Sequence, residues 1–217
     1  MTLAIFDLDN TLIGGDSDHS WGEFLVENHY VDAKNFKRQN DAFYEDYKAG
    51  CLDIIAYQEF ALKPLTEYEP AELAEMHRKF VQQKIEPIML SKASELINKH
   101  RNQDHQLLII TATNRFITAP IATMLGIDDL IATEGEIINQ KYTGRVSGTP
   151  SFGTGKITRL EQWLKNSTQT LEGSYFYSDS HNDLPLLEKV DNPVAVDPDA
   201  TLERVANERA WPIISLR

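Results

Sequence analysis

The chain has 217 residues, of which 41% are hydrophobic and 25% are charged, and its formal net charge at neutral pH is −12. This size and composition are typical of one large globular domain, or of a core with a smaller insertion. The negative charge argues against nucleic acid as a partner, because phosphate backbones bind basic surfaces, but one small phosphate can still bind in a local positive pocket.

No stretch approaches the roughly 18 apolar residues of a membrane span, so no membrane partner is expected. The single cysteine, Cys51, excludes an internal disulfide, and the first residues, "MTLAIFDL", lack a basic segment followed by a long apolar run. These features predict a cytoplasmic protein, either a monomer or a homodimer.

The first predicted element is a buried strand, "LAIFDL", which ends at a concentration of acidic residues. Four carboxylates follow within twelve positions: Asp7, Asp9, Asp16 and Asp18. Like charges repel at short range, and a carboxylate away from water is unfavourable unless something compensates it. The cluster therefore predicts a bound cation.

A long helical region without a convincing strand follows, from about Ser17 to His100. Apolar residues recur at helical spacing in "SWGEFLVENHY", "CLDIIAYQEFAL" and "PAELAEMHRKFVQQKI", and Pro70 marks a helix start. A region of helices alone does not fit the strand and helix alternation of the later chain. We therefore expect residues 16–100 to form an inserted helical cap domain.

From Gln106 onward, predicted strands and helices alternate. The strands are "QLLIITAT", "SYFYSDS" and "PVAVDP", and "LIATEGEIINQKYTGRV" predicts a strand with a small β-hairpin. The helices are "RFITAPIATMLGI", ending near Gly126, then "GKITRLEQWLKN", "NDLPLLEKV" and "ATLERVANERAW". This alternation predicts βαβ units and an α/β core with a parallel sheet flanked by helices, formed by residues 1–15 and 101–217.

Ligands of open parallel sheets bind beyond the carboxyl ends of the strands. Polar side chains gather at those predicted ends: Asp7, Asp9, Thr111, Thr113, Asp179, Asn182 and Asp183, with Lys156 at a helix start. Oxygen ligands without a histidine or cysteine pattern suit a hard cation, and Mg²⁺ is the usual choice beside a phosphate.

Four segments, "DLDNT", "ITATN", the isolated Lys156 and "SDSHNDLPLL", resemble the four motifs of the haloacid dehalogenase (HAD) superfamily in their usual order. They span residues 7 to 187, and the helical region between the first two resembles the cap of the phosphoserine-phosphatase-like branch, subfamily IB. The resemblance implies a Rossmann-like core, the cap, and a Mg²⁺-dependent phosphomonoesterase.

The resemblance also implies a role for each motif residue. Asp7 would be the nucleophile that forms an aspartyl-phosphate, and Asp9 would protonate the leaving oxygen and later deprotonate water. Thr111 and Lys156 would bind the phosphoryl oxygens. The metal ligands would be Asp7, Asp179 and the backbone carbonyl of Asp9, and Asp183 and Asn182 would support the site.

The reaction is not settled by the family, which includes dehalogenases, P-type ATPases and phosphomutases. Asp9 favours phosphomonoester hydrolysis, because a dehalogenase needs no acid for a leaving oxygen and the ATPases carry threonine there. Alternatives are a small-molecule phosphotransferase and a catalytically idle sensor of a phosphorylated metabolite. His181 lies in the last motif, where a loop or substrate-edge position is favoured over a catalytic role.

The substrate is expected to carry an amine but no carboxylate. Phosphoserine phosphatases place an acidic residue where Asp16 falls and supply a cap arginine for the carboxylate, but there is no arginine between Gln39 and His77. They also have S-G-G-F where this chain has "TATNRF". Histidinol phosphate, an intermediate of histidine biosynthesis, fits better than phosphoserine of serine biosynthesis, which remains the alternative.

The expected substrate-binding residues come from both parts of the chain. Asp16, Asp18 and Glu23 would pair with the ammonium and the imidazole of histidinol phosphate. Trp21 would stack on the ring, or would belong to the cap core. Two further residues of the second motif, Ala112 and Thr113, would line the same site.

Overall fold

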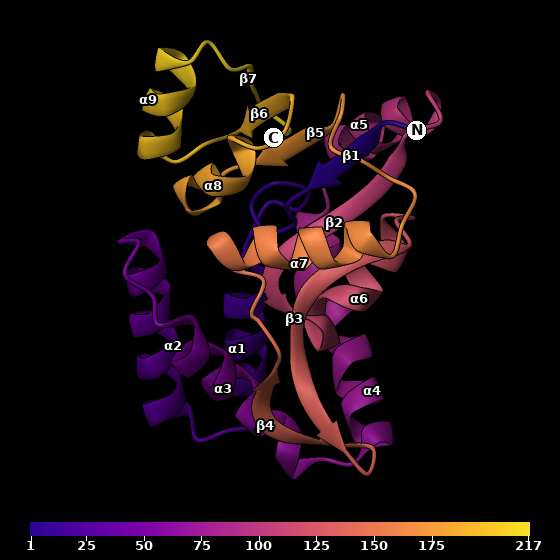
Figure 1. The fold of residues 1–217 in the computed structure, drawn as a ribbon. Coiled ribbons are helices and arrows are strands. Elements are labelled where there is room, and N and C mark those ends of the chain that lie inside the picture. Colours follow the sequence, from indigo (N-terminus) through magenta and orange to yellow (C-terminus); the bar gives the residue numbers. More distant parts are fainter.

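The computed structural model describes residues 1–217 and contains one seven-stranded sheet flanked by nine α-helices. The strand order is β4-β3-β2-β1-β5-β6-β7, and every neighbouring pair is parallel except the antiparallel β3 and β4 (Figure 1). This confirms the predicted α/β class and the hairpin. The strands are β1 (Leu3–Phe6), β2 (Gln106–Asn114), β3 (Asp129–Ile138), β4 (Lys141–Ser147), β5 (Tyr175–Ser178), β6 (Asn192–Val196) and β7 (Ile213–Ile214).

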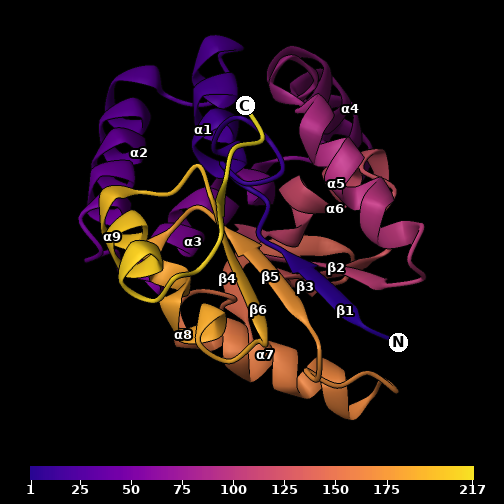
Figure 2. The same cartoon turned by 90° about the horizontal axis from the view of Figure 1, so that it is seen from above.

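Helices cover both faces of the sheet, as the view from above shows (Figure 2). Successive strand residues point to opposite faces, so Phe6 joins one hydrophobic core and Ile5 joins the other. One core is shared with α1 (Ser17–Glu27), α4 (Pro70–Phe80), α5 (Ser91–Arg101) and α6 (Arg115–Met124). The other is shared with α7 (Thr154–Lys165), α8 (Leu184–Leu187) and α9 (Ala200–Glu208).

The segment between β1 and β2 is helical throughout, as predicted. It also contains α2 (Ala33–Lys48) and α3 (Ile54–Leu62), together with the short helical turns η1 (Lys63–Glu67), η2 (Val81–Ile85) and η3 (Glu86–Ile88). Helix α4 begins at Pro70, where Glu69 and Glu72 form a reciprocal capping box. Helix α3 and η1 pack on β4, and Figure 1 shows the β3–β4 hairpin between α3 and α4. None of the helices combines the length and the apolarity that a membrane crossing requires.

Two details of the fold differ from the sequence expectations. The helix predicted from "NDLPLLEKV" is a 3₁₀ turn, η4 (His181–Asp183), followed by the short α8. Strand β7 was not predicted, because two residues are too few to show a periodic pattern, and it is held by pairing with β6. The end of α6 agrees, since Gly126 follows it with φ +67°.

Candidate active site

The site lies at the carboxyl end of β1. The chain adds β2, β3 and β4 on one side of this strand and β5, β6 and β7 on the other. Strand β1 pairs with β2 on one side and β5 on the other, which makes its end the topological switch point. Asp7 follows β1 directly, Thr111 and Thr113 lie in the last part of β2, and Asp179 follows β5. The fold thus brings the sequence-predicted residues of three strands to one edge of the sheet.

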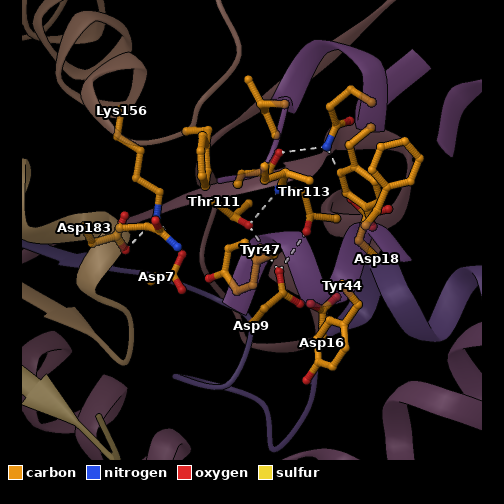
Figure 3. Close-up of a pocket in the computed structure, with 18 residues that line it drawn as sticks. Asp7, Asp9, Asp16, Asp18, Tyr44, Tyr47, Thr111, Thr113, Lys156 and Asp183 are labelled. Atoms are coloured by element: carbon orange, nitrogen blue, oxygen red, sulfur yellow. Dashed lines mark hydrogen bonds and ion pairs between the residues drawn. The ribbon is translucent and has the colours of Figure 1, made fainter. Parts of the chain in front are cut away.

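A pocket of about 580 Å³, including its open mouth, lies over this edge. Figure 3 shows Lys156, Asp7 and Asp183 at one end, Asp16 and Asp18 at the other, and Asp9 between them. The remaining predicted residues in its lining are Thr111, Ala112, Thr113 and Asn182. The other lining residues are Phe43, Tyr44, Tyr47, Leu52, Ile54, Tyr57, Gln58 and Phe152.

Lys156 joins two buried carboxylates at one end of the pocket. Its Nζ donates to Asp7 Oδ1 at 2.8 Å and to Asp183 Oδ2 at 2.7 Å, and all three side chains are at most 8% exposed. Burial alone would lower the pKa of Lys156, but the charges of Asp183 and Asp7 raise it above its usual range. The lysine is therefore a permanent cation, and its position beside Asp7 suits an anionic phosphoryl group.

Burial raises the pKa of Asp7 to about 7, although the charge of Lys156 opposes the rise. The charges of Asp183 and Asp9 raise this pKa further. One lysine among several carboxylates leaves an excess of negative charge, which a second cation would compensate.

Three hydrogen-bond donors fix the orientation of the Asp9 carboxylate. Oδ1 accepts from the backbone N–H of Ser17 at 2.6 Å, and Oδ2 accepts from the hydroxyls of Thr113 at 2.9 Å and Thr111 at 3.3 Å. The Thr111 hydroxyl, predicted to face a phosphoryl oxygen, thus also contacts Asp9. A carboxyl group held between Asp7 and the other end of the pocket could transfer a proton to or from a bound molecule.

Asp179 is oriented by Thr11, the threonine of the "DLDNT" motif. The Thr11 hydroxyl donates to Asp179 Oδ1 at 3.1 Å and accepts from the Asp179 backbone N–H at 3.1 Å. Burial raises the pKa of Asp179 well above its usual range, and the charge of Asp7 raises it further. Asp179 lines an adjoining cavity that shares Tyr44, Tyr47 and Asn182 with the main pocket.

These residues fit a magnesium ion with few protein ligands. No three acidic or imidazole side chains surround one point. Lys156 donates to Asp183 Oδ2 and to Asp7 Oδ1, and the Asp9 carboxylate accepts from three donors. Asp7 and Asp179 can therefore each offer one carboxylate oxygen, Oδ2, that accepts no hydrogen bond from the protein. Mg²⁺ commonly keeps several waters and takes only one or two carboxylates. The expected set of two carboxylates and the Asp9 carbonyl is consistent with this arrangement.

The acidic end of the pocket belongs to α1. Asp16 is the N-cap, and its side chain accepts from the His19 backbone N–H at 2.8 Å. Burial raises its pKa to about 7, and the charge of Asp9 contributes. Asp18 lies in the first turn, is 5% exposed, and accepts from Gln58 Nε2 at 3.3 Å. Both carboxyl groups line the pocket, as expected for residues that contact a substrate.

The expected stacking role of Trp21 is wrong. Trp21 is 1% exposed and packs against Phe24, Phe80 and Phe116 in the hydrophobic core, outside the pocket lining. Trp21 lies one helical turn beyond Asp18, farther along α1 from the pocket, where it packs against α4 and α6. Glu23 is also outside the pocket and forms an ion pair with Lys84.

The last motif supplies Asn182 and Asp183, both of which were expected to support the site. Asn182 lines the pocket, but its amide donates to the Ser180 hydroxyl at 3.2 Å and makes no contact with Lys156. Asp183 orients the lysine instead, and its Oδ2 also accepts from the Ser178 hydroxyl at 2.7 Å. His181 is bound to Asp199, the N-cap of α9, at 2.7 Å, which places it in the adjoining cavity.

The sequence did not predict the pocket-lining residues that come from α2 and α3. Tyr44 and Tyr47 of α2 and Tyr57 and Gln58 of α3 line the pocket. Tyr44 and Tyr47 lie three residues apart and resemble an ordinary helix face, and nothing in the local sequence marks any of these four residues as part of a site. Thr11 could have been found, because it lies in the first motif.

Comparison with known proteins gives a consistent result. Residues 4–188 match the haloacid dehalogenase-like hydrolase family. A Neisseria meningitidis protein named histidinol-phosphatase is 48% identical over 99% of both chains. Phosphoserine phosphatase SerB1 of Mycobacterium tuberculosis is 32% identical over 99% of this chain and 70% of its own length.

Solved structures show the same architecture. A Bordetella pertussis protein of unknown function has a TM-score of 0.94 and 41% identity, with both chains fully covered. The phospho-aspartyl intermediate analogue of a phosphoserine phosphatase has a TM-score of 0.70 at 19% identity, covering 100% of this chain and 93% of its own, and shares the fold. With a family match over most of the chain and the motifs at one sheet edge, this chain belongs to the haloacid dehalogenase-like hydrolases.

Proposed function

We propose that this hydrolase is a Mg²⁺-dependent phosphomonoesterase that acts on a small phosphorylated metabolite. The observation that carries the proposal is the buried Asp7, bonded to Lys156 at one end of an open pocket, with a second carboxyl group, Asp9, held in place nearby. A nucleophile, a cation for the phosphoryl oxygens and a proton donor are the groups that ester cleavage through a covalent intermediate needs.

In the proposed mechanism, an Asp7 oxygen attacks phosphorus while protonated Asp9 gives its proton to the departing ester oxygen. Water then attacks the aspartyl-phosphate, transfers a proton to Asp9, and releases inorganic phosphate with Asp7 regenerated. Lys156 and Thr111 stabilise the phosphoryl oxygens in both steps.

Asp7, Asp179 and the Asp9 carbonyl would hold Mg²⁺. When bound, the ion would screen the repulsion between the Asp7 carboxylate and the phosphate. Asp183 and Thr11 would support these residues indirectly. Asp183 accepts a hydrogen bond from Lys156, and Thr11 donates one to Asp179.

The proposal also assigns roles to two parts of the chain, a catalytic core of residues 1–15 and 101–217 and a cap of residues 16–100. Support comes from Tyr44 and Tyr47 of α2, which line the pocket together with Asp7 of the core. A wall contributed by such a cap would select the substrate, while the sheet edge would carry the chemistry.

Histidinol phosphate is the substrate that we propose. No arginine lines the pocket, and its one basic lining residue, Lys156, lies at the Asp7 end, where the proposed mechanism assigns it to the phosphoryl group. A substrate carboxylate would find no partner there, whereas an ammonium group would face Asp16 and Asp18. The 48% identity with the Neisseria histidinol-phosphatase supports the same substrate, and the 32% identity with SerB1 makes phosphoserine the competitor.

A phosphate-release screen over a few dozen phosphorylated metabolites with Mg²⁺ tests the proposal. We expect kcat/KM for histidinol phosphate to exceed that for phosphoserine by at least about tenfold, or about 1.4 kcal/mol in transition-state binding. Asp7→Asn should lower turnover by roughly 10³-fold or more, and Asp9→Asn should lower it strongly as well. Near-normal phosphate release by Asp7→Asn would rule out the covalent mechanism. A preference of the wild type for phosphoserine would rule out histidinol phosphate as the substrate.

A further inference from the structure

Gln58 of α3 has a fixed orientation at the pocket wall. Its side chain is fully buried, and Nε2 donates to Asp18 Oδ2 at 3.3 Å and to the Ala112 carbonyl at 3.2 Å. A flipped amide would set the Gln58 oxygen against these two acceptors, so the nitrogen must face them. Oε1 therefore faces the other way, and no group of the chain donates to it.

Asp18 presents a second unpaired acceptor in the same place. The residue is 5% exposed, and its Oδ1 has no donor in the chain. Burial raises the pKa of Asp18 well above its usual range, the charges of Asp16 and Asp9 raise it further, and the bond from Gln58 opposes the rise. Unpaired buried acceptors are unfavourable, and both of these residues line the pocket.

The surroundings favour a planar ring. Ile54, Tyr57 and Gln58 lie three and four residues apart on α3, so they present one face to the pocket, and Phe43 and Leu52 line it too. The side chains of this wall are apolar apart from the Gln58 amide and the Tyr57 hydroxyl. A ring that donates an N–H would satisfy the buried acceptors while its faces contact the apolar side chains.

We propose that Asp18 and Gln58 form a subsite that accepts the N–H of a heteroaromatic ring, and that Gln58 is a specificity-determining residue. This inference rests on the proposed function and deepens it: Asp16, at the N-cap of α1, is left for the ammonium group, while the ring nitrogen binds between α1 and α3. The subsite distinguishes an imidazole from a phenyl ring, because the phenyl ring would leave both acceptors unpaired.

The test compares histidinol phosphate with phenylalaninol phosphate, which has the same amine and phosphate but no ring N–H. The wild type should prefer histidinol phosphate by at least about tenfold in kcat/KM. Gln58→Met removes one acceptor and should lower this ratio about tenfold. Asp18→Asn should also lower it, because the Asn oxygen would pair with Gln58 and turn an N–H towards the ring. Glu59→Gln, an acid-to-amide change on the exposed side of α3, should keep the ratio.

The ratio of the two kcat/KM values separates substrate recognition from folding, because a merely structural role would lower kcat/KM equally for both substrates. If Asp18→Asn does not fold, Gln58→Met still decides the question. An unchanged ratio in a folded Gln58→Met variant would overturn the subsite, as would a wild type that hydrolyses both substrates equally well. Hydrolysis of other phosphomonoesters but neither of these two would refute the proposed substrate, and the subsite with it, while leaving the phosphatase assignment intact.

Discussion

Replacement of Lys156 by methionine tests the electrostatic arrangement at the base of the pocket. Methionine is apolar and unbranched like the lysine side chain, but it removes the cation between Asp7 and Asp183, which lie 2.8 and 2.7 Å from Nζ. Removing one partner of a buried ion pair commonly destabilises a protein by about 3–5 kcal/mol, because the other charge is left uncompensated. Asp183 keeps its bond from Ser178, so we expect a loss near the lower end, about 3 kcal/mol at pH 7.5.

The loss should depend on pH with a definite sign. Burial already raises the pKa of Asp7 to about 7, and removal of Lys156 should raise it further. Asp7 in the variant would then be protonated at pH 6, so this carboxyl group would no longer be a buried charge without a partner. The difference in stability between wild type and variant should therefore shrink as the pH falls from 7.5 to 6.

The assay is urea unfolding without metal, followed by circular dichroism at both pH values. Lys189→Met is the matched control, because Lys189 forms an exposed ion pair with Glu161 at 3.1 Å, and such pairs contribute at most about 1 kcal/mol. The double variant Lys156→Met/Asp183→Asn should recover part of the lost stability. A loss in Lys156→Met no larger than in Lys189→Met, with no change between the two pH values, would refute this reasoning.

Three further predictions concern the metal, the substrate and a buried histidine. EDTA should abolish phosphate release and Mg²⁺ should restore it, whereas high Ca²⁺ should inhibit, because its larger coordination shell would displace Asp7; full activity in chelator would contradict the assignment. Asp16→Asn keeps a good helix cap, and it should weaken kcat/KM for histidinol phosphate by about 1.5–3 kcal/mol more than for an uncharged aryl phosphate. Equal losses of kcat/KM for both substrates would instead show that Asp16 supports the fold or the metal site. His100 is 2% exposed beside the Tyr177 hydroxyl, and burial lowers its pKa to about 4 from 6.5, so its contribution to stability is present above pH 6.5 and is lost as the pH falls towards 4. Urea unfolding should show the wild type losing about 1.5 kcal/mol more than His100→Gln between pH 6.5 and 5, and His29→Asn, a surface control, should behave like the wild type.

The sequence by itself determined the fold class and predicted which side chains gather at one edge of the sheet. Apolar runs that end in acidic or hydroxyl residues mark β1, β2 and β5, and parallel strands place their carboxyl ends on the same side of a sheet. Asp7, Thr111 and Asp179 could therefore be assigned to one site although more than 170 positions separate the first from the last. The helical segment could be recognised because helical periodicity is a local property.

Only the tertiary structure decided which side chains face the pocket. Trp21 and Gln58 both lie on helices with apolar neighbours, yet Trp21 is in the core and Gln58 lines the pocket. The same holds for the last motif, where Asp183 rather than Asn182 contacts Lys156. The direction of a side chain depends on how its helix is rotated and packed against elements distant in sequence, and that rotation is set by contacts between segments rather than by any local pattern.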